Sequence, residues 1–189
     1  HKIGAKMFVG LRNKIRDSRL KKANEGLTPY QKRSRLPHTT LSLYEEIMHV
    51  PLLFVGINTP KNKIIHNLVR SLDIFPTVFD MLSIDTSTFK DKDGRSLIPM
   101  LEDKKLSELP GYFHTNPHKK ITLNDKVGIR TSKYKYFRAS MDKEKEINLY
   151  DLENDPQENN NIASENPAVV KEMEAVLEGL TKNATIDEP

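Results

Sequence analysis

The pattern of apolar and polar positions changes sharply within residues 43–55. Residues 43–49 mix charged and apolar side chains, whereas residues 50–55 form a nearly unbroken apolar run that contains Pro51. Such a run, closed by Gly56 and a polar turn, is typical of a strand buried on both faces of a sheet. Because proline cannot donate a hydrogen bond to a neighbouring strand, we expect Pro51 at the start of that strand.

Two later segments have the periodicity of amphipathic helices. In residues 67–84 the apolar side chains recur every three or four positions, with Ser71 as a plausible cap and Pro76 in the first turn. This pattern predicts a helix that covers a sheet. Residues 167–180 have the same periodicity and begin with Pro167, which predicts a closing helix.

Between these helices the chain alternates β-favouring segments with turns. The turn formed by residues 132–133 separates two segments rich in β-branched and aromatic residues, as in a hairpin. The strand candidates of this sheet are residues 111–115, 127–131, 134–138 and 148–152. Residues 61–65 are a further candidate for a strand or a hairpin arm.

These elements predict an α/β half followed by a small α+β appendage. We expect three segments: a basic helical and loop segment at residues 1–37, an α/β portion at residues 38–109, and a small α+β subdomain at residues 110–189. A chain of 189 residues is long enough for one domain with a real core and such an appendage.

The formal net charge of +4 conceals opposite charges at the two ends. Residues 1–37 carry eleven Lys and Arg against two acids, and residues 151–189 carry ten Asp and Glu against two Lys. The basic end has apolar residues at helical spacing, so it predicts a helix that lies on an anionic membrane, binds nucleic acid or steers an anionic substrate. A solvated helix without a partner explains the same pattern.

The composition excludes several classes of protein and site. The chain has no cysteine, which excludes disulfides, thiolate metal sites and a cysteine nucleophile. We find no stretch long enough to span a bilayer, no signal peptide, no Gly-rich phosphate loop and no cluster of Asp and His typical of a metal site. The basic-aromatic residues 134–138 lack the glycines of an RNA-binding strand, so no nucleic-acid partner is expected. The compartment stays open.

Five blocks in one order resemble the C-terminal part of the sulfatase family, in the alkaline-phosphatase-like superfamily. They are Leu-Tyr-Glu-Glu at residues 43–46 with His-Val-Pro-Leu-Leu at 49–53, Leu-Asp-Ile-Phe-Pro-Thr at 72–77, Asp-Gly-Arg-Ser-Leu at 93–97, Arg-Thr at 130–131 with Lys-Tyr-Lys-Tyr at 133–136, and Leu-Tyr-Asp-Leu-Glu-Asn-Asp-Pro at 149–156. Each block is weak evidence alone. Their common order over residues 38–163 is what carries the resemblance.

The resemblance implies part of a large mixed sheet flanked by helices, followed by a four-stranded antiparallel sheet with a C-terminal helix. It also implies hydrolysis of sulfate esters, on a small molecule or a glycan, by a formylglycine nucleophile with a divalent cation, usually calcium. In the family, the nucleophile motif and the metal ligands lie outside the part that these blocks cover. We therefore expect a C-terminal fragment that holds no metal ligand and is inactive alone.

The resemblance assigns one functional residue to this chain. His38 matches a Lys or His that contacts the sulfate or the leaving oxygen in many family members, although a single loop histidine is more often structural than catalytic. Tyr44, Glu45 and Glu46 are expected to hold the substrate loop in place.

Two alternatives stay open. Phosphodiesterases, phosphonate hydrolases and phosphoglycerol transferases of the same superfamily differ from sulfatases mainly outside this part. The other alternative is a non-catalytic binding module whose basic N-terminal arm docks on an anionic partner. The sequence leaves the substrate, the metal and the oligomeric state open.

Overall fold

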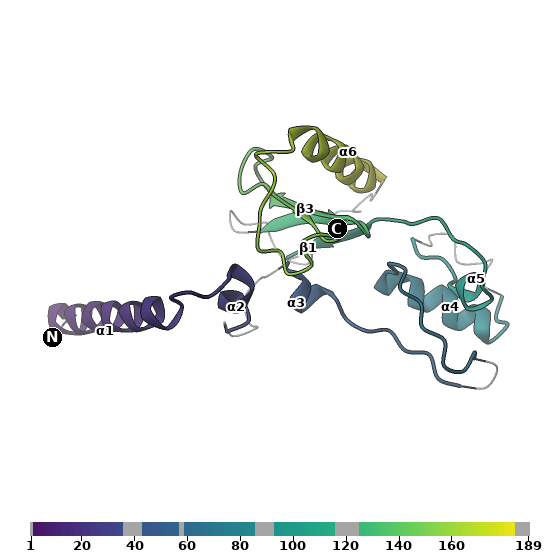
Figure 1. Ribbon diagram of the computed structural model, residues 1–189, viewed down its shortest axis with the longest axis horizontal. Helices are drawn as coiled ribbons and strands as arrows, with labels where there is room; N and C mark the ends of the chain where they lie inside the picture. The colour runs from purple at the N-terminus through teal and green to yellow at the C-terminus, as the bar shows by residue number, and fades with distance from the viewer. Residues whose placement is uncertain (1, 36–42, 57–58, 86–92, 116–124, 184–189) are drawn as a thin grey trace. The chain divides into compact units, whose positions relative to one another are not determined.

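The computed structural model describes residues 2–35, 43–56, 59–85, 93–115 and 125–183 (Figure 1). The surroundings of side chains are described from residue 12 to residue 182 within these ranges. The chain divides into two compact units, His1–Thr40 and Leu41–Pro189, and each is considered by itself. No helix in these ranges has the length and apolar character that crossing a membrane requires.

The first unit contains helix α1 (Lys2–Ala23) and the short helix α2 (Pro29–Arg33). The helix expected in the basic segment is thus present as α1, and the structure adds the second, short helix α2. A capping box explains α2: the Gln31 amide donates to the Thr28 hydroxyl at 3.2 Å, and the Thr28 amide donates to the Gln31 side chain at 3.0 Å. Pro29 then suits the first helical position.

The second unit is built around a four-stranded antiparallel sheet in the order β1-β2-β3-β4. Its strands are β1 (Gly111–His114), β2 (Lys126–Arg130), β3 (Tyr134–Ala139) and β4 (Asn148–Asp151). Both the predicted hairpin and the two outer strands are confirmed. Helix α6 (Pro167–Asn183) closes the chain and begins at the proline that the sequence placed at its first position.

The two faces of this sheet are covered by different segments. Helix α6 packs on one face, over a core made of Val127, Ile129, Tyr136, Leu149, Met173 and Leu177. The opposite face is covered by residues 43–48, which include the short helix α3 (Glu45–Met48) (Figure 1). The second core contains Leu43, Phe113, Phe137, Tyr150 and Leu152.

Gly128 makes room for the aromatic side chains of this second core. A Cβ atom at residue 128 would lie 2.6 Å from the Cβ of Phe137 and 2.7 Å from a ring carbon of Phe113. Both distances are too short for real contacts, so only glycine lets the two rings approach the centre of the sheet. Glycine at this position is thus required both by the packing of the two rings and by the Tyr136 carbonyl oxygen, which would lie 2.2 Å from the same Cβ atom.

The remaining helices are shorter than the sequence predicts. Residues 67–84 contain the 3-10 turn η1 (Ser71–Asp73) and helix α4 (Ile74–Met81), and a further short helix, α5 (Ile98–Leu101), follows. Ser71 is not the cap. The helical turn begins because the Arg70 amide donates to the Asp73 carboxylate at 3.0 Å.

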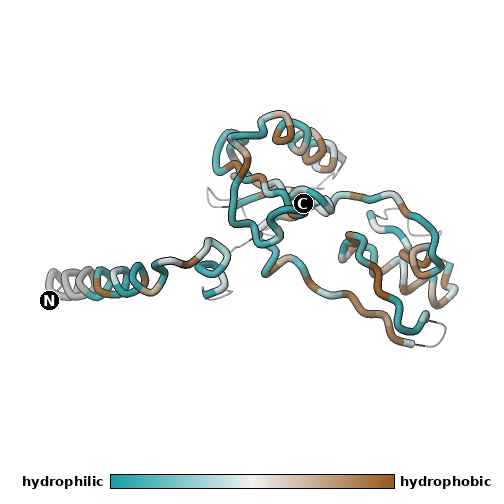
Figure 2. The backbone as a smooth tube through the Cα atoms, in the orientation of Figure 1, coloured by the Kyte–Doolittle hydropathy of each residue, from teal (hydrophilic) through white to brown (hydrophobic). Residues whose placement is uncertain are grey.

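The buried strand predicted at residues 50–55 is wrong for the described structure. The run is extended but unpaired, and Val50, Leu53 and Val55 are 71%, 80% and 84% exposed. Figure 2 shows it as a brown, hydrophobic tube between α3 and α4. A strand needs hydrogen-bonded neighbours, and the described strands β1–β4 pair only with one another. Residues 61–65 form no strand for the same reason.

The apolar stripe of α4 likewise covers no sheet in the described part of the chain. Phe75 is 48% exposed and Leu82 is 63% exposed. The overall class is confirmed, since a sheet and helices combine in an α/β arrangement with a small antiparallel sheet and a closing helix. What the described residues do not form is the larger mixed sheet.

Candidate functional site

The side chain of Glu45 links the segment after residue 42 to the four-stranded sheet. Its carboxylate accepts two hydrogen bonds from the Arg130 guanidinium, both at 2.9 Å, and a third from the Lys135 ammonium at 3.0 Å. Arg130 ends β2 and Lys135 lies in β3. A bidentate, charge-assisted arrangement of this kind fixes both position and orientation, so helix α3 is held firmly on this face.

A second carboxylate closes the cluster from the other side. Glu158 Oε1 lies 3.1 Å from Lys135 Nζ, and both side chains are fully buried. Glu158 Oε2 accepts a hydrogen bond from the Glu45 amide at 2.6 Å, which satisfies a donor at the start of α3. Lys135 is thus a buried cation between two carboxylates, as a buried charge requires.

The backbone at Glu158 has an unusual conformation. Its φ angle is +50°, in the left-handed region that residues other than glycine seldom occupy. Such a conformation costs on the order of 1 kcal/mol and persists only where the surroundings fix it. Here the contacts with Lys135 and with the Glu45 amide hold the side chain, and so the turn, in place.

The two carboxylates have opposite pKa shifts. Burial by itself raises the pKa of Glu45, but the hydrogen bonds and charges of Arg130 and Lys135 lower it from 4.5 to about 2. Burial raises the pKa of Glu158 above its usual range, against the opposing effect of Lys135. Glu45 is therefore ionised throughout the ordinary pH range, and it is the anion that organises the cluster.

Asp73 joins two of the sequence blocks that carry the family resemblance. It is 2% exposed and accepts hydrogen bonds from Arg70 Nη2 at 2.8 Å and from the Arg95 amide at 3.0 Å. Burial raises its pKa, but the Arg70 side chain and the two amides lower it further, so the net shift is downward. Gly94 is needed here, because a Cβ atom would lie 2.0 Å from the Leu72 carbonyl oxygen.

Thr77 completes this junction. Its hydroxyl donates to the Asp73 carbonyl at 2.6 Å and accepts from the Leu97 amide at 2.9 Å, and the side chain is fully buried. The Asp and Thr of the first block thus bind the backbone amides of the Arg and the Leu of the second. These residues have a structural explanation, and the block does not belong to a reaction centre of the described chain.

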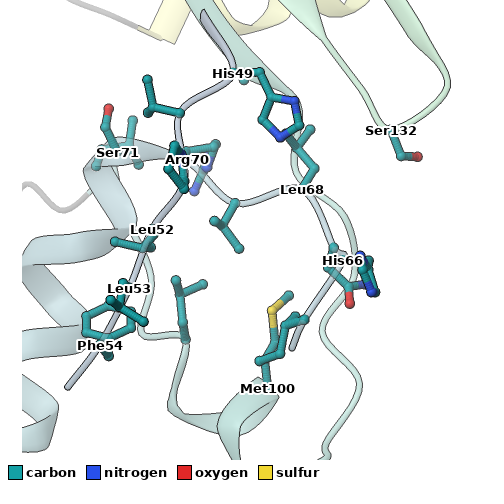
Figure 3. A pocket seen from close by; sticks show the side chains of 18 of the residues that line it. His49, Leu52, Leu53, Phe54, His66, Leu68, Arg70, Ser71, Met100 and Ser132 are labelled. Atoms are coloured by element: carbon teal, nitrogen blue, oxygen red, sulfur yellow. The ribbon is translucent and has the colours of Figure 1, made fainter. Parts of the chain in front are cut away.

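A cavity of about 790 Å³ lies between the apolar run at residues 50–55, helix α5 and the edge of the sheet. Figure 3 shows His49, His66 and Arg70 at its wall, together with apolar side chains. The labelled apolar residues are Leu52, Leu53, Phe54, Leu68 and Met100. Among the described lining residues, no hydroxyl is hydrogen-bonded to a histidine, so the cavity lacks the paired nucleophile and base of a hydrolytic site.

Of the four site residues predicted from the sequence, the structure describes Tyr44, Glu45 and Glu46. His38 lies outside the described residues, so its role stays a prediction. Tyr44 packs edge-on against Phe137 with ring centres 5.6 Å apart, and its hydroxyl lies 3.5 Å from that of Tyr150. Glu45 is the anchor described above, and Glu46 lies beside it at the start of α3. Whether they support a substrate loop stays a prediction.

Sequence reasoning missed the partners of Glu45. Lys135 lies in β3 beside the aromatic residues Tyr134, Tyr136 and Phe137, and this was the available signal, because a lysine buried among aromatic side chains needs a counter-charge. Glu158 gave no such signal, since it follows a proline turn in a polar stretch. Their partnership depends on contacts between segments far apart in the chain.

The described side chains do not fit the cation that the resemblance implies. No group of three or more His, Asp or Glu in these ranges is placed to hold a metal ion. The chain also contains no cysteine from which a formylglycine would form. We therefore derive no reaction step through either group from these residues.

The profile of the family described as "N-sulphoglucosamine sulphohydrolase, C-terminal" matches residues 40–183, about three quarters of the chain. The chain belongs to this family. The blocks at residues 43–53, 72–77, 93–97, 130–136 and 149–156 all fall within the match, so the predicted resemblance to the C-terminal part of sulfatases is confirmed.

Individual sulfohydrolase relatives agree with the family match. The chain is 30% identical over 149 residues to arylsulfatase K of Gallus gallus, covering 74% of this chain and 27% of that protein. It is 31% identical over 130 residues to the delta 4,5-hexuronate-2-O-sulfatase of Bacteroides thetaiotaomicron, covering 66% and 26%. A sulfatase-family crystal structure from the same bacterium superposes with a TM-score of 0.67 at 25% identity, over 82% of this chain and 34% of that one.

The chain therefore spans about a quarter of the length of the curated sulfohydrolase relatives it matches. The match begins at residue 40, so the basic unit with α1 and α2 lies outside it. The cluster of Glu45, Lys135 and Glu158 lies inside it.

Proposed function

We propose that this chain forms the C-terminal part of a hydrolase that cleaves sulfate esters of an anionic glycan. The observation that carries the proposal is the family match over residues 40–183. The names of the family and of one relative refer to sulfated sugars, a sulphoglucosamine and a 2-O-sulfated hexuronate. Sulfated sugar units are accordingly the substrate class we propose.

The nucleophile and the cation belong, in this proposal, to sequence outside this chain. Residues of that outside sequence would hold a formylglycine and a divalent cation, calcium in the resemblance, and these groups would supply the nucleophile and the polarisation of the sulfate group. The exposed apolar run at residues 50–55 supports the proposal, because soluble proteins seldom leave a large apolar surface uncovered. The remainder of a longer enzyme would cover it.

His38 is the residue we propose to contact the sulfate or the leaving oxygen. Its support is the resemblance, together with the firm attachment of the segment that follows it through Glu45 and Arg130. A group that protonates a leaving oxygen acts only if it is held within reach of it, so an anchor next to the loop serves this role.

The test uses the full-length protein that contains this chain. We expect release of inorganic sulfate from 2-O-sulfated hexuronate or N-sulfated glucosamine disaccharides, and a loss in kcat of about 100-fold or more in His38→Ala. His66→Ala is the matched control, since it removes a histidine from the cavity wall and should leave kcat unchanged. No sulfate release from any sulfated sugar, or an equal loss in both variants, contradicts the proposal.

A further inference from the structure

The basic helix α1 carries a charged surface that neither the family match nor the proposed reaction explains. Every side chain from residue 14 to residue 23 is exposed, so this half of the helix buries no face in the described structure. A helix with no packed face draws its stability from elsewhere, such as a partner that binds it. Figure 2 shows this half mostly in the teal of hydrophilic residues.

Three arginines of α1 lie on one side of the helix. Arg12, Arg16 and Arg19 are spaced by four and three residues, which places them in one row along the helix. We call this row the arginine face. Lys14 and Lys21 lie on the opposite side, so the positive charge extends around the helix.

These cations are largely uncompensated. Among the cations from residue 12 to residue 22, only Arg16 pairs with a carboxylate in the described structure, that of Asp17 at 3.4 Å, and both side chains are about two-thirds exposed. Exposed pairs of this kind contribute little, so the pair with Asp17 is a weak competitor for a ligand that binds the row. Arginine suits planar, bidentate recognition of oxyanions, which a single sulfate group offers.

We propose that the arginine face binds a sulfated polysaccharide, the polymer from which the active site takes its sulfate groups; this inference rests on the proposed function for the choice of polymer. A membrane is a poorer fit for residues 12–23, because their exposed apolar residues Ile15 and Leu20 lie on different sides of the helix, so this part of α1 presents no apolar face. A polymer held on the arm keeps further sulfated units at a high local concentration around the same chain.

The direct test is the affinity of the full-length protein for dextran sulfate, measured against salt concentration, with unsulfated dextran as the blank. Replacing Arg12, Arg16 and Arg19 together by Ala is expected to weaken binding about 10- to 100-fold at low salt and to flatten the slope of log K against log salt by about 2. Replacing the same three arginines by Lys keeps the positive charge but removes the planar guanidinium groups, so an affinity between those of the Ala variant and the unchanged protein is expected.

A charge-matched control removes three exposed lysines elsewhere: Lys61, Lys105 and Lys171, each replaced by Ala. It should keep the affinity of the unchanged protein. Equal weakening in the control, or no weakening in the arginine variant, overturns the inference. So does binding to DNA, or to anionic phospholipid vesicles, that is tighter than binding to dextran sulfate at equal charge concentration.

The binding test is independent of the reaction. If dextran sulfate binds through the arginine face but no sulfate is released from any sugar, the inference stands and the proposed function fails. If the arginine face binds dextran sulfate and the protein also releases sulfate from sugars, the Ala variant of the arginine face should have a raised KM and an unchanged kcat for polymeric substrate. Both constants should be unchanged for a sulfated monosaccharide.

Discussion

The guanidinium of Arg130 holds the carboxylate of Glu45 through two parallel hydrogen bonds of 2.9 Å, across 85 residues of chain. This contact attaches the segment that carries the Leu-Tyr-Glu-Glu block to the end of β2. Lys135 and Glu158 extend it into a buried cluster of four charges. Residues 43–48, which follow His38 in the sequence, are thereby fixed to the small sheet, on the face opposite α6.

Replacing Lys135 by Met tests this cluster. The change leaves Glu158 buried without its counter-charge, so we expect the free energy of unfolding to fall by about 3–5 kcal/mol in urea titrations. Lys133→Met is the control, because that lysine lies in the same hairpin with its side chain exposed. Equal stability of the two variants would show that the buried ammonium does not hold the cluster together.

The pH dependence of stability tests the role of Glu45. Its pKa is about 2 in the folded chain and 4.5 without the contacts, so its stabilising effect is complete above pH 4.5 and is lost as the pH falls toward 2. Glu158 acts in the opposite direction, because its pKa is raised and its protonation favours the folded chain.

Glu45→Gln should therefore be less stable than the unchanged chain at pH 5, and the gap should narrow as the pH falls toward 2. Urea midpoints measured at several pH values give the comparison. A gap that stays constant or widens in acid would mean that the Glu45 charge is not what stabilises the fold.

Two glycines are expected to respond to alanine with opposite signs. At Gly94 a Cβ atom would collide with the backbone of Leu72, so Gly94→Ala should destabilise the chain by about 1–3 kcal/mol. At Gly179, within α6, nothing lies within 4 Å of the new Cβ, and Gly179→Ala should stabilise by about 0.5–1 kcal/mol. Thermal unfolding of both variants measures this, and a harmless Gly94→Ala would show that the Asp73 junction is looser than described.

Local patterns predicted the small sheet and the closing helix well. The hairpin of β2 and β3 has its turn and both its strands within 14 consecutive residues, Lys126 to Ala139, and α6 carries its own apolar periodicity and its first proline. The strands β2 and β3 pair with a segment that is near in the sequence. Helix α6 packs on an apolar sheet face, and its own apolar periodicity is enough to predict that contact. Sequence alone therefore sufficed for them.

Elements that depend on distant partners were predicted less well. The apolar run at residues 50–55 has the composition of a buried strand, but burial needs neighbours that the described residues do not supply. The Glu45 amide meets Glu158 across 113 residues, a contact that no local pattern contains. The proposed substrate contact of His38 came from the resemblance, and it stays a prediction.

A full-length protein that contains this chain should hydrolyse sulfate esters in preference to esters of phosphorus. The most direct measurement is kcat/KM of the full-length protein for 4-nitrophenyl sulfate, beside the corresponding phosphate monoester, phosphate diester and phosphonate ester, before and after removal of divalent cations with a chelator. We predict that the sulfate ester gives the highest value and that the chelator abolishes it. Turnover of a phosphorus ester in preference to the sulfate ester would place the protein in another branch of the superfamily and contradict the account.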